Sequence, residues 1–270
     1  MRRIAIVSIV SIVCLVFFAA GPALTQQEDT ELAKQTQNPI ANLISVPLQN
    51  NFNFGVGPED DLQYVLNIQP VIPVGLGEKL LLINRAILPV MYQPELAPGV
   101  GQEWGLGNLT YQGYFSPKSE DSSITWGIGP VLTVPTNTDD AFGSDKWAAG
   151  PGAVIVWMKD RWVIGGLINN IWDYAGPASA PDVNFMTAQY FLNYNFPAGF
   201  YFTSAPIITA DWEADSGDTW TLPVGGGFGK VFRFGKLPIN MSLQGYWNAV
   251  HPDDGAEWQM RFQAQFLFPK

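Results

Sequence analysis

The C-terminal stretch WQMRFQAQFLF (Trp258–Phe268) alternates between apolar and polar residues over most of its length. One face carries Trp258, Met260, Phe262, Ala264, Phe266 and Phe268, and the other carries Gln259, Arg261, Gln263 and Gln265. Because successive side chains of a strand point to opposite faces, this pattern predicts a β-strand with one apolar and one polar face.

The same period of two recurs along the chain from residue 43 onward. It predicts twelve strands, at residues 43–55, 62–74, 80–93, 104–116, 124–136, 147–158, 162–174, 183–196, 200–212, 219–232, 237–249 and 258–268. The third, sixth and seventh carry apolar residues on both faces. Most of the twelve are longer than the roughly 5–6 residues usual in soluble proteins and suit a tilted crossing of a bilayer. An even number of such strands predicts an all-β, transmembrane antiparallel β-barrel.

Composition and the N-terminus support this assignment. Of the 270 residues 47% are hydrophobic and only 14% charged, against about 25% charged in soluble domains. Arg2 and Arg3 precede an apolar run and a group of small residues, which predicts a secretory signal peptide over residues 1–25. The alternative interpretation of this run is a membrane anchor. We expect residues 26–42 to form a periplasmic N-terminal segment, with a short helix between Asp29 and Gln37, and residues 43–270 to form the outer-membrane barrel.

Charge and cysteine content limit the kinds of partner and metal site that the mature chain can have. Cys14 lies in the predicted signal peptide, so the mature chain has neither a disulfide nor a cysteine metal site. Loss of Arg2 and Arg3 changes the net charge from −10 to −12, which argues against nucleic acid. The predicted outer loops hold 15 of the 24 acidic residues. Ordinary solvated loops explain these residues, and divalent-cation binding by stretches such as Asp253–Glu257 is the alternative, although the ligand spacing of a calcium loop is missing.

The tryptophans and the chain end indicate contact with lipid. All ten tryptophans lie within three residues of a predicted strand end, and tryptophan prefers the membrane–water interface. The last strand ends on Phe266 and Phe268, which resembles the C-terminal signal by which the barrel assembly machinery recognises its clients. Here Pro269 and Lys270 follow the terminal aromatic residue.

Prolines are the feature that fits this scheme least. Nine prolines fall inside predicted strands, where each removes a backbone donor from the ladder: Pro47, Pro70, Pro73, Pro89, Pro130, Pro135, Pro206, Pro223 and Pro238. They predict bulges or bends in the strands. They also leave a soluble periplasmic β-sandwich as an alternative.

Short motifs along the mature chain resemble one protein family. They are LAKQTQNP (Leu32–Pro39), QNNFNF (Gln49–Phe54), YQPELAP (Tyr92–Pro98), GLGN (Gly105–Asn108), WEADSGD (Trp212–Asp218) and PVGGG (Pro223–Gly227). Together they resemble a family of outer-membrane β-barrel transporters that is grouped under a MetA pathway of phenol degradation, and whose members are often mislabelled neuromedin U. The resemblance implies an outer-membrane barrel and transport of aromatic compounds, and it assigns no substrate residue.

The polar face of the strands predicts the lining of the lumen. The candidate residues are Gln49, Asn51, Asn53, Gln63, Asn67, Gln69, Arg85, Asn108, Gln112, Gln189, Asn193, Asn240, Gln244, Gln259, Arg261, Gln263 and Gln265. No ring of one charge, the mark of an ion filter, appears among them. We therefore expect a passive channel for small neutral or weakly polar molecules, aromatic ones included. The alternative is a structural barrel whose amides bond one another and close the lumen.

The sequence contains few residues that could support catalysis or bind a transition metal. His251 is the only histidine, and an acyl hydrolase would need it beside a serine nucleophile such as Ser204 or Ser242. With one histidine and no mature cysteine, a transition-metal site is not expected. The sequence therefore predicts no enzyme and no cofactor.

Overall fold

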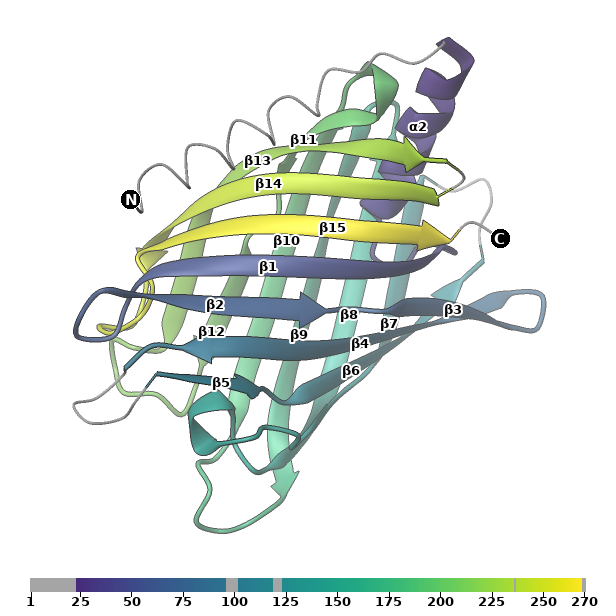
Figure 1. Cartoon of the computed structure of the whole chain (residues 1–270). Helices are drawn as coiled ribbons and strands as arrows, with labels where there is room; N and C mark the ends of the chain where they lie inside the picture. Colours follow the sequence, from purple (N-terminus) through teal and green to yellow (C-terminus); the bar gives the residue numbers. More distant parts are fainter. Residues whose placement is uncertain (1–22, 96–101, 119–122, 236, 269–270) are drawn as a thin grey trace.

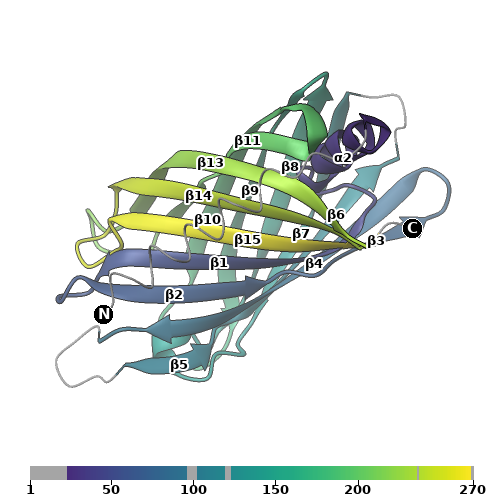
Figure 2. The same ribbon diagram turned by 45° about the horizontal axis from the view of Figure 1, so that its top comes forward.

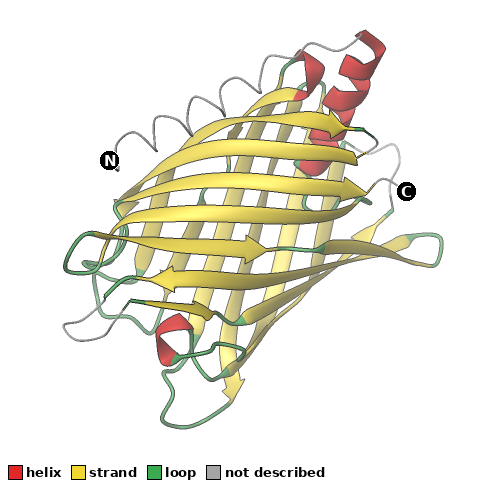
Figure 3. Cartoon of the chain, in the orientation of Figure 1, coloured by secondary structure: helices red, strands yellow, loops and turns green. Residues whose placement is uncertain are grey.

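The computed structural model describes residues 23–95, 102–118, 123–235 and 237–268 (Figure 1). The predicted signal peptide, up to residue 22, and the residues after Phe268 lie outside this range. Figure 3 shows that most of the described chain is strand. The strands are β1 Ile44–Val56, β2 Asp61–Ile68, β3 Val71–Leu76, β4 Leu80–Gln93, β5 Glu103–Leu106, β6 Leu109–Pro117, β7 Ile124–Val134, β8 Trp147–Lys159, β9 Trp162–Ala175, β10 Asn184–Asn195, β11 Phe200–Ser204, β12 Ile207–Asp211, β13 Trp220–Phe234, β14 Leu237–Val250 and β15 Trp258–Phe268.

The fifteen segments form one antiparallel sheet that closes on itself. β15 pairs with β1 in continuous register from Ile44–Phe268 to Phe54–Trp258, and β9 pairs with β10 on the far side of the ring. β2 and β3 both lie between β1 and β4, β5 and β6 both pair with β4, and β11 and β12 both lie between β10 and β13. Each of these three pairs occupies one position in the wall. The barrel therefore has twelve strand positions, and the predicted fold and strand number are confirmed.

Prolines account for two of the three strand breaks. Pro70 separates β2 from β3, and Pro206 separates β11 from β12. At the first break, proline lacks a backbone donor, but the Pro70 carbonyl oxygen still accepts a hydrogen bond from the Ala86 N–H at 3.1 Å. A third proline, Pro223, lies at the register shift between β13 and β14. A missing donor thus interrupts the sheet locally without opening it, and a closed barrel replaces the β-sandwich alternative.

The outer surface of the wall is apolar. Residues at alternate positions, such as Ile128, Ile155 and Val224, are more than half exposed, although they are large hydrophobic side chains. Nine of the ten tryptophans are also exposed: Trp104, Trp126, Trp147, Trp162, Trp172, Trp212, Trp220, Trp247 and Trp258. In water such a surface would drive aggregation, whereas in a bilayer it contacts the acyl chains.

The two ends of the barrel differ. At one end, which we call the short-turn end, residues 77–79, 160–161 and 196–199 connect successive strands. At the other, the long-loop end, residues 135–146, 176–183, 212–219 and 251–257 form longer connections. Helix α2 (Ala23–Thr36) and the C-terminal end of β15 both lie at the short-turn end, as the tilted view in Figure 2 shows. Two single-turn helices complete the described structure, η1 (Asp140–Phe142) and η2 (Pro197–Gly199).

Helix α2 differs from its prediction in one respect. It ends at Thr36, before Pro39 as expected, but it begins at Ala23 rather than Asp29. Asp29 is therefore inside the helix, where its carboxylate accepts from Arg233 at 2.6 Å. Within the described residues, none of the helices has the length and apolar character needed to cross a membrane.

Candidate lumen site

The inward face of the wall has two chemically different parts. Strands β1, β2, β14 and β15, with the residue that follows β2, carry amides, which we call the amide wall: Gln49, Asn51, Asn53, Gln63, Asn67, Gln69, Asn240, Gln244, Gln259, Gln263 and Gln265. Strands β4, β6, β8, β9 and β10 carry buried hydrophobic residues near the short-turn end, which we call the apolar wall: Leu81, Ile83, Tyr114, Val154, Val156, Val163, Leu167 and Phe191. The sequence predicted the first part and missed the second.

Hydrogen bonds join the amides into a lateral relay. Gln69 Nε2 donates to Gln49 Oε1 at 3.3 Å, and Gln49 Nε2 donates to Asn51 Oδ1 at 3.1 Å. Nearer the long-loop end, Gln259 donates to Asn53, which donates to Gln63. The alternation of the strands aligns these side chains, because directly paired residues share a face. Much of the polar lining therefore bonds to itself.

An arginine lies at each end of the relay. Arg85 Nη2 donates to Gln69 Oε1 at 2.5 Å, and Arg261 Nε donates to Asn51 Oδ1 at 3.1 Å. Arg261 also packs over the ring of Tyr246, with 5.0 Å between the guanidinium carbon and the ring centroid. The side chains that accept from these guanidinium groups are neutral amides.

The apolar wall is packed over glycines. Tyr114, which is only 1% exposed, lies against Gly152, where a Cβ atom would approach its ring to 3.1 Å. Glycine at this position therefore leaves room for an aromatic ring inside the barrel. The hydroxyl of Tyr114 and that of Ser116, on the same inward face of β6, have no hydrogen-bond partner in the described structure.

The chain between α2 and β1 enters the short-turn end of the lumen. Gln37 and Asn195 exchange two amide hydrogen bonds, at 2.9 and 3.0 Å, and Asn240 Nδ2 donates to Thr36 Oγ1 at 3.0 Å. Asn38 Oδ1 accepts from the Ile40 amide at 3.0 Å. Ile40 is 2% exposed and belongs to the same packed cluster as the apolar wall, so burial of its side chain contributes about 1.5–3 kcal/mol to docking of this segment.

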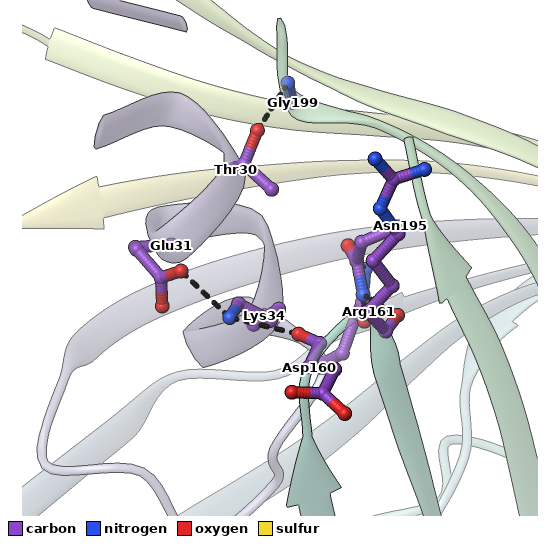
Figure 4. A network of polar contacts seen from close by, with 8 residues as sticks. Thr30, Glu31, Lys34, Asp160, Arg161, Asn195 and Gly199 are labelled. Carbon is purple, nitrogen blue, oxygen red and sulfur yellow. Dashed lines mark hydrogen bonds and ion pairs between the residues drawn. The ribbon is translucent and has the colours of Figure 1, made fainter. Parts of the chain in front are cut away.

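Contacts hold helix α2 at the rim of the same end (Figure 4). Gly199 N–H of η2 donates to Thr30 Oγ1 at 3.3 Å, and Lys34 Nζ donates to the Asp160 carbonyl at 3.1 Å. Ala33 is fully buried beside Tyr201 and Val231. Residues 30–43 thus dock on the barrel from its rim to its interior.

One cavity of about 150 Å³ lies between this segment and the wall. Ten of the predicted lumen residues line it: Gln49, Gln69, Arg85, Gln189, Asn193, Asn240, Gln244, Arg261, Gln263 and Gln265. Its surface also includes Gln35–Leu43, apart from Ile40 and Asn42, the apolar residues Val71, Phe191 and Ala205, and Ser45, Pro47, Tyr201, Thr203 and Ser242. The cavity surface thus combines amides with hydrocarbon.

Asn108 has a role that the sequence does not indicate. Its Oδ1 accepts from the backbone of Thr136 and Asn137, and its Nδ2 donates to the Ser144 carbonyl at 2.7 Å. It lies in the break between β5 and β6, where one extra residue is inserted opposite β4. Its amide therefore anchors the loop that contains η1.

A buried lysine with two carboxylate partners fixes another part of the long-loop end. Lys146 bonds to the carboxylates of Asp182 and Asp173, and its side chain is only 8% exposed. The hydrogen bond to Asp182, followed by that to Asp173, raises the pKa of the Lys146 ammonium group above its ordinary value. These contacts tie the loop at residues 176–183 to the end of β9.

The acidic loops do not form a metal centre in the described chain. Asp211, Asp218, Asp253 and Asp254 line a pocket of about 380 Å³, but the described residues contain no group of three or more His, Cys, Asp or Glu side chains placed to hold a metal ion. His251 Nδ1 lies 2.8 Å from the Pro252 carbonyl oxygen, within its own loop.

A closed antiparallel sheet with hydrocarbon outside and amides inside defines an outer-membrane β-barrel, because closure satisfies every backbone group without water. The predicted fold class, a membrane β-barrel, is confirmed. An outer-membrane channel from Pseudomonas putida F1 shares this fold with a TM-score of 0.63 and 17% identity, over 84% of this chain and 94% of that one.

Two further solved structures are similar. The NanC porin has a TM-score of 0.52 and 8% identity, over 83% of this chain and all of the porin. The CymD monoaromatic hydrocarbon channel has a TM-score of 0.41 and 12% identity, over 94% of each chain. No family model matches the chain, and no curated protein matches it. At these identities, the first two structures establish the fold.

Proposed function

We propose that this protein is a passive outer-membrane channel for small, weakly polar molecules with an apolar body, aromatic ones included. The observation that carries the proposal is the cavity of about 150 Å³ inside a closed barrel, whose surface combines amides with hydrocarbon. Amides exchange hydrogen bonds with a polar group, and the hydrocarbon accommodates the remainder of the solute. Both solved structures that establish the fold are named as a channel or a porin.

The main alternative function is a closed structural barrel. The amide relay and the docked segment at residues 36–43 favour it, because both fill the lumen with bonds made within the chain. The channel proposal therefore includes release of residues 36–43 from the short-turn end when the pore conducts. This segment contacts the wall through a few amides and Ile40, and it takes no part in the strand ladder.

Conductance tests the proposal. The mature protein, folded into planar bilayers, is expected to give discrete current steps, and in liposomes it is expected to accelerate entry of small neutral solutes such as benzyl alcohol. Absence of both current and uptake, in protein whose gel mobility still shifts on boiling, would support the closed structural barrel.

Three further inferences accompany the proposal. We infer that the short-turn end faces the periplasm, so that the segment at residues 26–42 belongs to the periplasmic side and its last residues enter the lumen from there. We also infer that the last strand is recognised by the barrel assembly machinery through Phe266 and Phe268. The acidic long-loop end would attract divalent cations loosely, as a charged surface, and not through a coordinated site.

A further inference from the structure

Arg85 and Arg261 are the only charged residues that line the lumen cavity in the described part of the chain. Arg261 is 2% exposed. Within the described residues, neither guanidinium group forms an ion pair with a carboxylate. The cavity therefore contains two positive charges and no negative one.

Neutral oxygens occupy only part of the donor capacity of these groups. Arg261 donates to Asn51, to Gln259 and to the Ala205 carbonyl. Arg85 donates to Gln69 and Gln112. A guanidinium group has five N–H donors, so each arginine keeps donors for a further acceptor. The side chains of the amide relay are neutral, so they supply no negative charge to balance the two arginines.

The uncompensated charge favours an anionic occupant. A charge enclosed by protein is unfavourable unless a counter-charge or a full set of hydrogen bonds replaces water. Two such cations on the surface of one cavity raise the local positive potential, and a planar carboxylate matches the fork of N–H groups that guanidinium presents.

The rest of the cavity surface sets the size and character of the remainder of that anion. Leu43, Val71, Phe191 and Ala205 supply hydrocarbon. The volume of about 150 Å³ equals that of an engineered protein cavity, in a different protein, that binds one benzene molecule. The space thus suits a single ring or a short branched chain.

We propose that this cavity is a binding site for a small organic carboxylate whose apolar body is about the size of one ring. The carboxylate lies towards Arg85 and Arg261, and the ring packs against hydrocarbon such as the side chain of Phe191. This inference rests on the proposed channel function and names the substrate class of the same lumen. It goes beyond the neutral solutes that the sequence predicts, because only the structure places both arginines on one cavity without an acid.

The acidic long-loop end does not oppose this site at physiological ionic strength. The carboxylates of Asp211, Asp218, Asp253 and Asp254 line a pocket at the mouth, whereas Arg261 lies four residues into β15. Exposed charges are screened over about 8 Å in physiological salt. The mouth therefore affects the rate of entry of an anion more than its affinity for the cavity.

Equilibrium binding to the folded mature protein in detergent tests the proposal, with calorimetry as the measurement. Benzoate is the probe, benzamide is its neutral isostere, and acetate lacks the ring. We expect benzoate to bind at least about tenfold more tightly than either, because each comparison removes one half of the recognition. Equal affinity for benzoate and benzamide would overturn the proposal.

Variants locate the site. Arg261→Gln and Arg85→Gln are each expected to weaken benzoate binding about tenfold and to leave benzamide binding unchanged, whereas Arg261→Lys keeps the charge and most of the affinity. Arg161→Gln is the matched control, because it removes an exposed guanidinium group outside the cavity. Boiling-dependent gel mobility establishes that each variant is folded. An equal loss of benzoate affinity in Arg161→Gln would contradict the assignment.

The two proposals fail separately. Loss of conductance with intact benzoate binding would contradict the channel and leave the carboxylate site. Conductance and benzyl alcohol uptake without any preference for benzoate over benzamide would leave the channel and remove the carboxylate site.

Discussion

The amide wall and the apolar wall stabilise the same lumen by different means. In the amide wall, most side chains satisfy their neighbours through directed bonds such as Gln49–Asn51, so a single change at these positions leaves a specific partner without a bond. In the apolar wall, Val156 and Val163 are fully buried by contact with several neighbours. Stability there depends on how well the side chains fit together, and not on any single bond. The comparison teaches that one lumen can be stabilised by directed hydrogen bonds on some strands and by hydrocarbon packing on others.

The largest effect is expected where the chain itself occupies the apolar wall. Ile40→Lys places a cation in hydrocarbon at a cost of the order of several kcal/mol, which shifts the equilibrium of segment 36–43 towards release by more than about tenfold. Open probability in planar bilayers should rise accordingly. Ile40→Leu, which keeps the volume, serves as the control, and an unchanged open probability in Ile40→Lys would show that this segment does not close the lumen.

Shape complementarity in the apolar wall predicts the next effect. Gly152→Ala should lower the free energy of unfolding by about 1–3 kcal/mol, because its Cβ would lie 2.9 Å from Val131 and 3.1 Å from the Tyr114 ring. Gly166→Ala is the matched change in the neighbouring strand, where the nearest atom would be 3.6 Å away. Denaturant titration of the folded barrel measures both, and similar losses in the two variants would remove the argument from packing.

Directed bonding in the amide wall predicts that substitution at one position lowers the free energy of unfolding by about 1–3 kcal/mol, whereas substitution at another position hardly changes it. Asn51→Leu deprives Arg261 Nε and Gln49 Nε2 of their shared acceptor. Asn67→Leu changes the same face of the amide wall at a residue whose side chain makes no hydrogen bond in the described structure. If the two variants unfold at the same denaturant concentration, the relay contributes nothing to stability.

The smallest effect lies outside both walls, at the long-loop end. The pKa of Lys146 is raised in the folded protein, so its contribution to stability is fully present below the unfolded pKa and is lost as pH rises through the folded value. The difference in thermal midpoint between the native protein and Lys146→Met should therefore shrink between pH 8 and strongly alkaline pH. A constant difference would assign the effect to packing of the lysine chain.

Much of the fold was predictable because alternation with a period of two has one simple solution over twelve long segments. The amide wall followed from the same alternation: Gln49, Arg261 and Gln265 share the inward face on which the sequence placed them. The strand breaks and the loop role of Asn108 were not predictable, since they depend on which residues the register brings together.

The sequence contained a pattern that indicates the apolar wall. The predicted strands at 80–93, 147–158 and 162–174 are apolar on both faces, and they are the strands β4, β8 and β9 that supply most of this wall. A strand in a barrel that is apolar on both faces must present hydrocarbon to the lumen as well as to lipid. Ile40 had no such signal, because its burial depends on where a short segment docks.

The seam between β1 and β15 has a consequence for biogenesis. It pairs Ile44 with Phe268 and Phe54 with Trp258, so the first and last strands must meet before the ring exists. Such non-local pairing requires closure of a loop that spans nearly the whole chain, which makes folding slow. Until synthesis and export are complete, both edges of the growing sheet remain unpaired and prone to aggregation. The chain therefore depends on chaperoning in transit more than a protein of equal size built from local contacts.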